Sequence, residues 1–168
     1  MKVKNWFLIP FVTLAVACVR PSEPIIYSAY TPILITKASL HKSIRLEAPH
    51  AIEDAAKIYY KGSLIYISER FKGVHIIDNA DPSQPKNKGF ISVPGCVDMA
   101  VKKDVLYVDN AIDLVSISLT AAENGKLEVL KRVENVFPEV SAPDGGAVPS
   151  KFNQHNRPAN TVIIGWRK

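Results

Sequence analysis

LIYISERFKGVHIIDNADPSQPKNKGFISVPG, residues 64–95, is the stretch that decides the fold. Three short runs rich in β-branched and aromatic residues lie within it, at 64–68, 74–78 and 88–93. A turn containing a glycine separates the first two runs. The second turn, DPSQP at 81–85, stops strand pairing, because its prolines cannot donate a backbone hydrogen bond and its Asp and Ser bond back to the local backbone. The stretch therefore predicts one small antiparallel sheet.

The same order of strands begins again after this stretch. With residues 57–60 as a first strand, residues 56–96 hold four strands. Four further strand-like runs follow, at residues 97–101, 105–109, 113–119 and 126–133. Tyr107 lies 41 positions after Tyr66, with matching apolar neighbours. Two unrelated β-meanders are the alternative, but a repeat of about 40 residues that carries four strands is typical of propeller blades.

The flanking segments add a strand on each side and a helix. Residues 31–36 and 161–166 predict strands. Residues 37–46 predict a helix of about two turns, because Leu40 and Ile44 lie four positions apart. The expected fold class is therefore mainly β: two four-stranded antiparallel, propeller-like blades, which form an incomplete β-propeller with a short N-terminal helix cap.

Two blades are too few to close a propeller, which has about four to eight. Three arrangements would resolve this: the chain is the N-terminal part of a longer ancestral propeller, it pairs with a partner or a second copy, or its open ends are capped. We expect a compact packing of two sheets, capped by helix 37–46 and strand 161–166. Some apolar surface would stay exposed and serve a partner protein or self-association through the exposed blade face.

The first residues have the pattern of a signal peptide. Lys2 and Lys4 form a short basic region, and an uncharged apolar run leads from them to Cys18. The run is too short to span a membrane, which takes about 20 residues. Residues 14–17 resemble the lipobox of bacterial lipoproteins, which implies cleavage before Cys18, diacylglycerol on its sulfur and an acylated amine. An uncleaved anchor helix is the alternative. Either way, the chain would sit on a membrane and face away from the cytoplasm.

GVHIID at 73–78, followed by DPSQP at 81–85, resembles the LVIVD repeat, in which a glycine and a valine-rich strand ending in Asp precede a DPSxP turn. Tyr66 and YVD at 107–109 resemble the tyrosine-bearing strand of that repeat. The second copy departs from the pattern, with Ser-Ile-Ser in place of Val-Asp and no DPSxP prolines. The likeness covers about residues 56–136. It implies a β-propeller in a surface or periplasmic lipoprotein of the Bacteroidetes type, and it implies nothing about chemistry.

Length and composition fit one folded domain. The chain has 168 residues, of which 47% are hydrophobic and 22% charged, and this composition argues against disorder. Loss of Lys2 and Lys4 would lower the formal net charge from +5 to +3. The basic residues are scattered, so we expect no nucleic-acid partner. With lipid on Cys18, Cys96 is the remaining thiol, and no intrachain disulfide is expected.

Few residues have the spacing of a catalytic or cofactor site, and we expect no catalytic residue, metal or cofactor. Cys96 beside Asp98 would act as a nucleophile only with a histidine nearby, and a small buried thiol is its expected role. The long Pro-rich loop is where a binding function would lie, because long ordered loops often carry function. Its candidate residues are Asp144, Gly145 and Gly146.

Other polar residues do not predict a metal site. Asp109, Asn110 and Asp113 lie near one turn, where we expect them to be turn formers rather than cation ligands. His75 lies in an apolar strand, so a hydrogen-bonded or surface imidazole is expected. The remaining histidines lack the spacing of a metal site, and they are His41, His50 and His155.

These patterns predict a signal peptide at 1–17, a tether at 18–30 and a β-repeat domain at 31–168. Within that domain, the second repeat covers 97–136, and a Pro-rich loop with a terminal strand covers 137–168. The expected function is a lipid-anchored binding or structural module of the cell envelope, without enzymatic activity, in the outer membrane, facing the periplasm or the surface. The alternative is a hydrolase-like envelope enzyme of unknown substrate.

Overall fold

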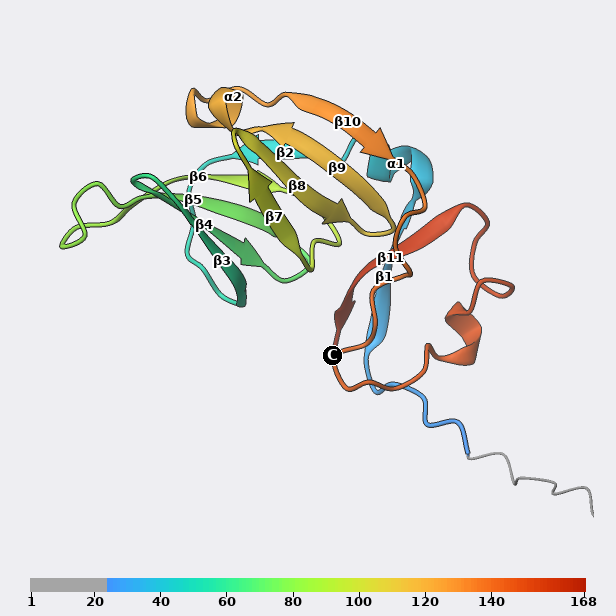
Figure 1. Ribbon diagram of the computed structural model, residues 1–168. Helices are drawn as coiled ribbons and strands as arrows, with labels where there is room; N and C mark the ends of the chain where they lie inside the picture. Colours follow the sequence, from blue (N-terminus) through green and yellow to red (C-terminus); the bar gives the residue numbers. More distant parts are fainter. Residues whose placement is uncertain (1–23) are drawn as a thin grey trace, which may run out of the picture.

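The computed structural model describes residues 24–168, which form three antiparallel sheets, none closed on itself (Figure 1). The first sheet has the strand order β2 (Arg45–Glu47), β6 (Lys86–Ser92), β5 (Gly73–Asp78), β4 (Leu64–Glu69) and β3 (Ala55–Lys61). The second sheet has the order β10 (Val129–Val133), β9 (Asp113–Ser118), β8 (Val105–Asn110) and β7 (Met99–Lys102). The third sheet pairs β1 (Thr31–Thr36) with β11 (Thr161–Arg167). The expected mainly β class is confirmed.

The first hairpin of each large sheet has the same register. Lys61 pairs with Leu64 in the β3–β4 hairpin, and Lys102 pairs with Val105 in the β7–β8 hairpin. Lys102 is 41 positions after Lys61, and Val105 is 41 positions after Leu64. Tyr107 follows Tyr66 by the same spacing. The two sheets also share one strand order, in which consecutive strands are neighbours from β3 to β6 and from β7 to β10.

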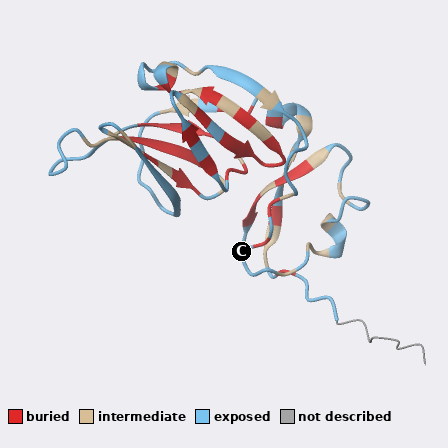
Figure 2. Cartoon of the chain, viewed as in Figure 1, coloured by how far each residue is buried: buried red, intermediate tan, exposed pale blue. Residues whose placement is uncertain are grey.

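The two large sheets pack across one core, and their equivalent faces do not meet. The first sheet buries Tyr66 and Ile76 in this core, and the second sheet buries Leu106 and Val108. Side chains alternate between the faces of a strand, so Tyr107 points to the outer face, where it is 37% exposed. Figure 2 shows this alternation of burial along β9. The core face of the first sheet is therefore equivalent to the outer face of the second sheet. The two sheets are stacked in the same orientation, front to back.

The inner edges of the two sheets, β3 and β7, lie side by side and are joined by ion pairs. Lys57 Nζ lies 2.8 Å from Asp98 Oδ1, and Lys61 Nζ lies 2.6 Å from Asp104 Oδ1. Lys57 and Asp98 are 41 positions apart, so they occupy corresponding places in the two sheets. Solvent-accessible pairs of this kind contribute at most about 1 kcal/mol each, and the apolar core holds the sheets together.

The helix expected over residues 37–46 is wrong in its second half. α1 (Lys37–His41) is a short helix capped by Thr36, whose hydroxyl oxygen accepts the Ser39 N–H. The Ser43 hydroxyl then bonds to the Leu40 carbonyl, and the chain turns into β2. Pairing of β2 with the open edge of β6 outweighs the helical spacing of the apolar residues. The first sheet consequently has five strands, where four were expected.

The start of β7 also differs from the prediction, which placed it at residue 97. The N–H groups of Val97 and Asp98 bond to the Asp109 carboxylate at 2.9 and 2.8 Å, and they are not free to pair with a neighbouring strand. The first sheet has the same arrangement, because the Lys57 N–H bonds to the Ser68 hydroxyl oxygen at 2.9 Å.

Two short helices lie in segments for which the sequence predicted none. α2 (Leu119–Glu123) starts after Ser118, whose hydroxyl oxygen accepts the Ala121 N–H. This helix delays β10, which starts at Val129 rather than at 126. η1 (Ser150–Phe152) is a single 3₁₀ turn in the Pro-rich segment.

A small lobe surrounds β1 and β11. Val140, Ala142, Ile163 and Trp166 form its core, and Trp166 Nε1 donates to the Val140 carbonyl at 3.1 Å. Leu40 of α1 belongs to a second apolar cluster, with Ala111 and Ile112 of the β8–β9 turn and Val162 of β11. In the part of the chain that the structure describes, no helix is long and apolar enough to cross a membrane.

Candidate functional site

Residues 48–54 cover part of the outer face of the first sheet. They connect β2 at one edge of this sheet to β3 at the other, so they cross it. The His50 ring lies against His75 of β5 and Phe90 of β6, with centroid distances of 4.8 and 4.5 Å. His75 and Phe90 are therefore buried, although they point away from the core between the sheets.

The buried carboxylate of Glu69 is the centre of a polar network beneath this loop. Glu69 Oε2 accepts a hydrogen bond from His75 Nε2 at 2.7 Å, and Glu69 Oε1 lies 2.7 Å from Lys72 Nζ. Lys72 also bonds to Glu53 of the loop at 2.5 Å. Burial alone would raise the pKa of Glu69, but hydrogen bonds from Lys72 and His75 outweigh burial and lower this pKa. The ionised carboxylate thus ties the loop to the sheet.

Three side chains of this network, His50, Glu69 and His75, have donor atoms within 4.8 Å of one another, a set that would suit a transition metal. Their hydrogen bonds favour another role. The Asn87 side-chain amide donates to the His50 carbonyl and accepts from the Gly89 N–H, which orients it. It therefore donates to His75 Nδ1 at 3.3 Å, while His75 Nε2 donates to Glu69. Both ring nitrogens of His75 are thus engaged by protein groups, and these contacts support a structural role for the cluster.

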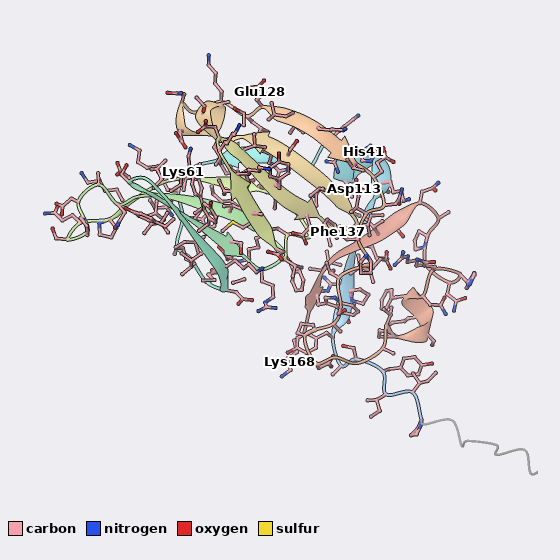
Figure 3. The ribbon with its side chains drawn as sticks, viewed as in Figure 1. His41, Lys61, Asp113, Glu128, Phe137 and Lys168 are labelled. Atoms are coloured by element: carbon pink, nitrogen blue, oxygen red, sulfur yellow. The ribbon has the colours of Figure 1, made fainter. Side chains whose placement is uncertain are left out.

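The outer face of the second sheet borders a groove with a volume of about 710 Å³. Ala100, Tyr107 and Leu114 line it on the sheet side. The opposite wall is the segment 137–143, which leads from β10 into the small lobe, and Phe137 at its start is labelled in Figure 3. The lining is mainly apolar, which suits apolar or aromatic side chains of a partner better than a charged small molecule.

The Cys96 thiol belongs to the main apolar core and is fully buried. Burial, followed by the charges of Asp109 and Asp98, raises the pKa of Cys96 well above its ordinary value. The thiol hydrogen points to the Asp98 carbonyl, with a distance of 3.9 Å between Sγ and the oxygen. A buried, protonated thiol is a poor nucleophile, and Cys96 has the packing role that the sequence predicted.

Asp109, Asn110 and Asp113 come together at the end of β8 and the start of β9. Arg132 binds two of them, with Nη2 at 2.9 Å from Asn110 Oδ1 and Nη1 at 2.7 Å from Asp113 Oδ2. His41 Nε2 lies 3.6 Å from Asp113 Oδ2, and Figure 3 shows the two residues close together. The oxygens are used in internal bonds, in agreement with the predicted structural role.

The predicted binding loop, Asp144, Gly145 and Gly146, is packed against the start of the described chain. Asp144 Oδ2 accepts the Ala29 N–H at 2.9 Å, and this bond lowers the pKa of Asp144. A Cβ on Gly146 would lie 2.6 Å from the Ser28 backbone, so glycine is required there. The loop therefore fixes residues 27–29, at the end of the predicted tether, and a binding role for it stays a prediction.

A scan against protein-family models finds no family that matches the chain, and searches of curated proteins and of solved structures also find no match. The LVIVD resemblance thus stays a prediction drawn from the residues quoted above. The predicted signal peptide at 1–17 and the lipidation site Cys18 lie outside the described residues.

Sequence reasoning did not identify the groove or the Glu69 network. The network joins residues from a loop, two strands and a turn, and no local motif connects them. The sequence held a weak signal for the groove in the equivalent positions of Tyr66 and Tyr107. If the two sheets are stacked front to back, one tyrosine lies in the core and the other on an outer face.

Proposed function

We propose that this protein is a lipid-anchored binding or structural module of the cell envelope, without enzymatic activity. In this proposal, its two large sheets are propeller-like blades of the LVIVD type. The observation that carries the proposal is the open outer face of the second sheet, where Tyr107 and Leu114 border a groove.

The blade interpretation is supported by three relations between the sheets. They share a strand order, their inner strands β3 and β7 are adjacent, and their stacking is front to back. Blades of a propeller are related in the same way, by rotation about a central axis that runs beside the inner strands. The membrane anchor is supported by the residues around Cys18, whose replacement in Cys18→Ser would release the protein from the membrane fraction.

A site-specific photocrosslinker tests the binding function. A photoreactive phenylalanine derivative in place of Tyr107 would report contacts at the groove, and the same derivative in place of Leu130, which is 48% exposed on the edge strand β10, is the control. We expect crosslinked products in intact cells from position 107 and none from position 130. Equal labelling at both positions, or none at either, would contradict the proposal.

The enzyme alternative would need a concave site with converging polar groups and a titratable pair with perturbed pKa values, such as Cys96 with a histidine. Cys96 is buried with a raised pKa, and its polar neighbours are backbone groups and carboxylates. Cys96 therefore lends no support to the enzyme alternative, whereas the open face of the second sheet supports the binding module.

A further inference from the structure

The outer face of each large sheet is equivalent in register to the core face of the other large sheet. On the outer face of the first sheet, Ile58 is 68% exposed and Tyr60 is 63% exposed. They correspond in register to Met99 and Val101, because Ile58 pairs with Ile67 as Met99 pairs with Val108. Met99 and Val101 lie on the core face of the second sheet and are buried against the first.

The outer face of the second sheet corresponds in turn to the core face of the first. Tyr107 occupies the place of Tyr66, and Ala100 the place of Tyr59, since each pair faces across its hairpin in the same register. The core packs two different sheet faces against each other. The protein also exposes one face equivalent to each of these two. Two copies would bring these faces together in the same front-to-back arrangement.

The charges at the inner edge fit the same arrangement. Lys57 and Asp98 form an ion pair within the chain and occupy corresponding positions in the two sheets. A rotation that places the first sheet on the second places Lys57 on Asp98. A second copy stacked in this way would bring its own Lys57 to Asp98, and that carboxylate is more than half exposed.

Loop 48–54 limits the region of contact on the first sheet, and segment 137–143 borders this region on the second. The loop covers the outer face over β5 and β6 and leaves Ile58 and Tyr60 on β3 exposed. An incoming copy would therefore dock its β7 and β8 against β3 and β4, nearest the inner edge. In this region β3 and β7 already lie side by side within one chain.

We propose that the outer face of the second sheet binds the outer face of the first sheet in another copy of this chain, so that the chains assemble into a closed ring. This inference rests on the blade interpretation given above and names the partner of the open face. The contact is heterologous, and a heterologous contact closes into a ring when its rotation divides a full turn. A ring of about four to eight blades corresponds to about two to four copies.

The test compares variants of the full chain, solubilised in detergent, by size-exclusion chromatography with light scattering. Ile58→Glu alters the first sheet's outer face and Tyr107→Glu alters the second's, while Leu130→Glu is a matched control on an edge strand outside the contact. We expect a discrete oligomer for the wild type and the control. A charge placed in an apolar contact should weaken association at least about tenfold in the other two variants.

Mixing the two defective variants gives the decisive result. Each retains one intact face, so an equimolar mixture of Ile58→Glu and Tyr107→Glu should form a one-to-one dimer and nothing larger. Recovery of binding also shows that both variants are folded. A mixture that stays monomeric, or a control that dissociates like the variants, would overturn the inference.

A monomeric wild type would also overturn it. If position 107 still crosslinks to another protein in that case, the binding module survives and the ring does not. If position 107 crosslinks to nothing, the proposed function fails as well.

Discussion

The two large sheets share a strand order but treat their outer faces differently. The first sheet covers part of its outer face with loop 48–54 and fixes that loop through the buried Glu69. The second sheet leaves its outer face beside a groove. The two sheets share one core, and the outer face is partly covered on the first sheet and borders a groove on the second.

Polar residues at equivalent positions show how this difference arises. Glu69 and Asn110 both end the second strand of a sheet's inner hairpin, and both are fully buried. Glu69 binds Lys72 and His75, whereas Asn110 binds Arg132. Glu69, the charged residue of the two, thus belongs to the sheet whose outer face is covered. We expect its network to be the part of this cover that is most sensitive to mutation.

The largest expected effect comes from removing the carboxylate. Glu69→Ala leaves the buried His75 without its acceptor and removes one of the two acceptors of Lys72, which is half exposed and keeps Glu53. Two hydrogen bonds to a charged group are lost, and this should cost about 3–4 kcal/mol of unfolding free energy. Asn110→Ala, at the equivalent place, removes an uncharged side chain that accepts from Arg132 and donates to the Pro94 carbonyl, and it should cost less, about 1–3 kcal/mol. Urea denaturation measures both variants. A larger loss for Asn110→Ala would show that the covered face does not depend on the Glu69 network.

A backbone substitution in the first sheet comes next. A Cβ at Gly73, where φ is +151°, would lie 2.1 Å from the Ile91 carbonyl oxygen. Gly73→Ala should therefore cost about 3 kcal/mol through strain and displaced backbone. Gly62→Ala is the control, because that site also has positive φ but no atom within 4 Å, and it should cost about 1 kcal/mol. Thermal unfolding of both variants would reveal equal losses if Gly73 were not crowded.

The two tyrosines give a smaller effect. Tyr66 is buried and its hydroxyl donates to Glu123 Oε1 at 2.6 Å, so Tyr66→Phe should cost about 1.5–3 kcal/mol. Tyr107→Phe, on the open face, should change stability by less than about 0.5 kcal/mol. Chemical denaturation distinguishes them, and similar values would mean that the two tyrosines do not occupy different environments.

The smallest effect is a dependence on pH. The pKa of Glu69 in the folded protein lies below its ordinary value of 4.5. Its charged form therefore stabilises the folded protein fully above pH 4.5, and this contribution is lost as pH falls through the lower, folded-state pKa. The stability difference between wild type and Glu69→Gln should be constant near neutral pH and shrink in acid. Parallel pH profiles for the two proteins would contradict the lowered pKa.

Much of the strand pattern could be predicted, because it is written in local alternation. β7 and β9 alternate between more and less buried residues, as period two predicts, whereas β5 is an apolar run buried on both faces. β2 could not be predicted, since residues 45–47 become a strand only by pairing with β6, which lies far along the chain.

The candidate site was less accessible to sequence reasoning. Cys96 was placed correctly, because a cysteine after Pro-Gly at the start of a strand is usually buried. His50, by contrast, contacts His75 only because loop 48–54 crosses the sheet, and no spacing in the sequence indicates that path. Residues 144–146 were recognised as an ordered loop, but their contact with Ser28 and Ala29 depends on the third sheet.

Pairing of β1 with β11 sets an order for folding during synthesis. β1 emerges among the first described residues, and its partner strand is among the last to be made. Until then, Leu34 and Ile35 have no strand to pair with, and the entropic cost of closing so long a loop delays the contact. The small lobe should therefore be the last part of the molecule to form, and a chain interrupted before Thr161 would present an unprotected strand to chaperones and proteases.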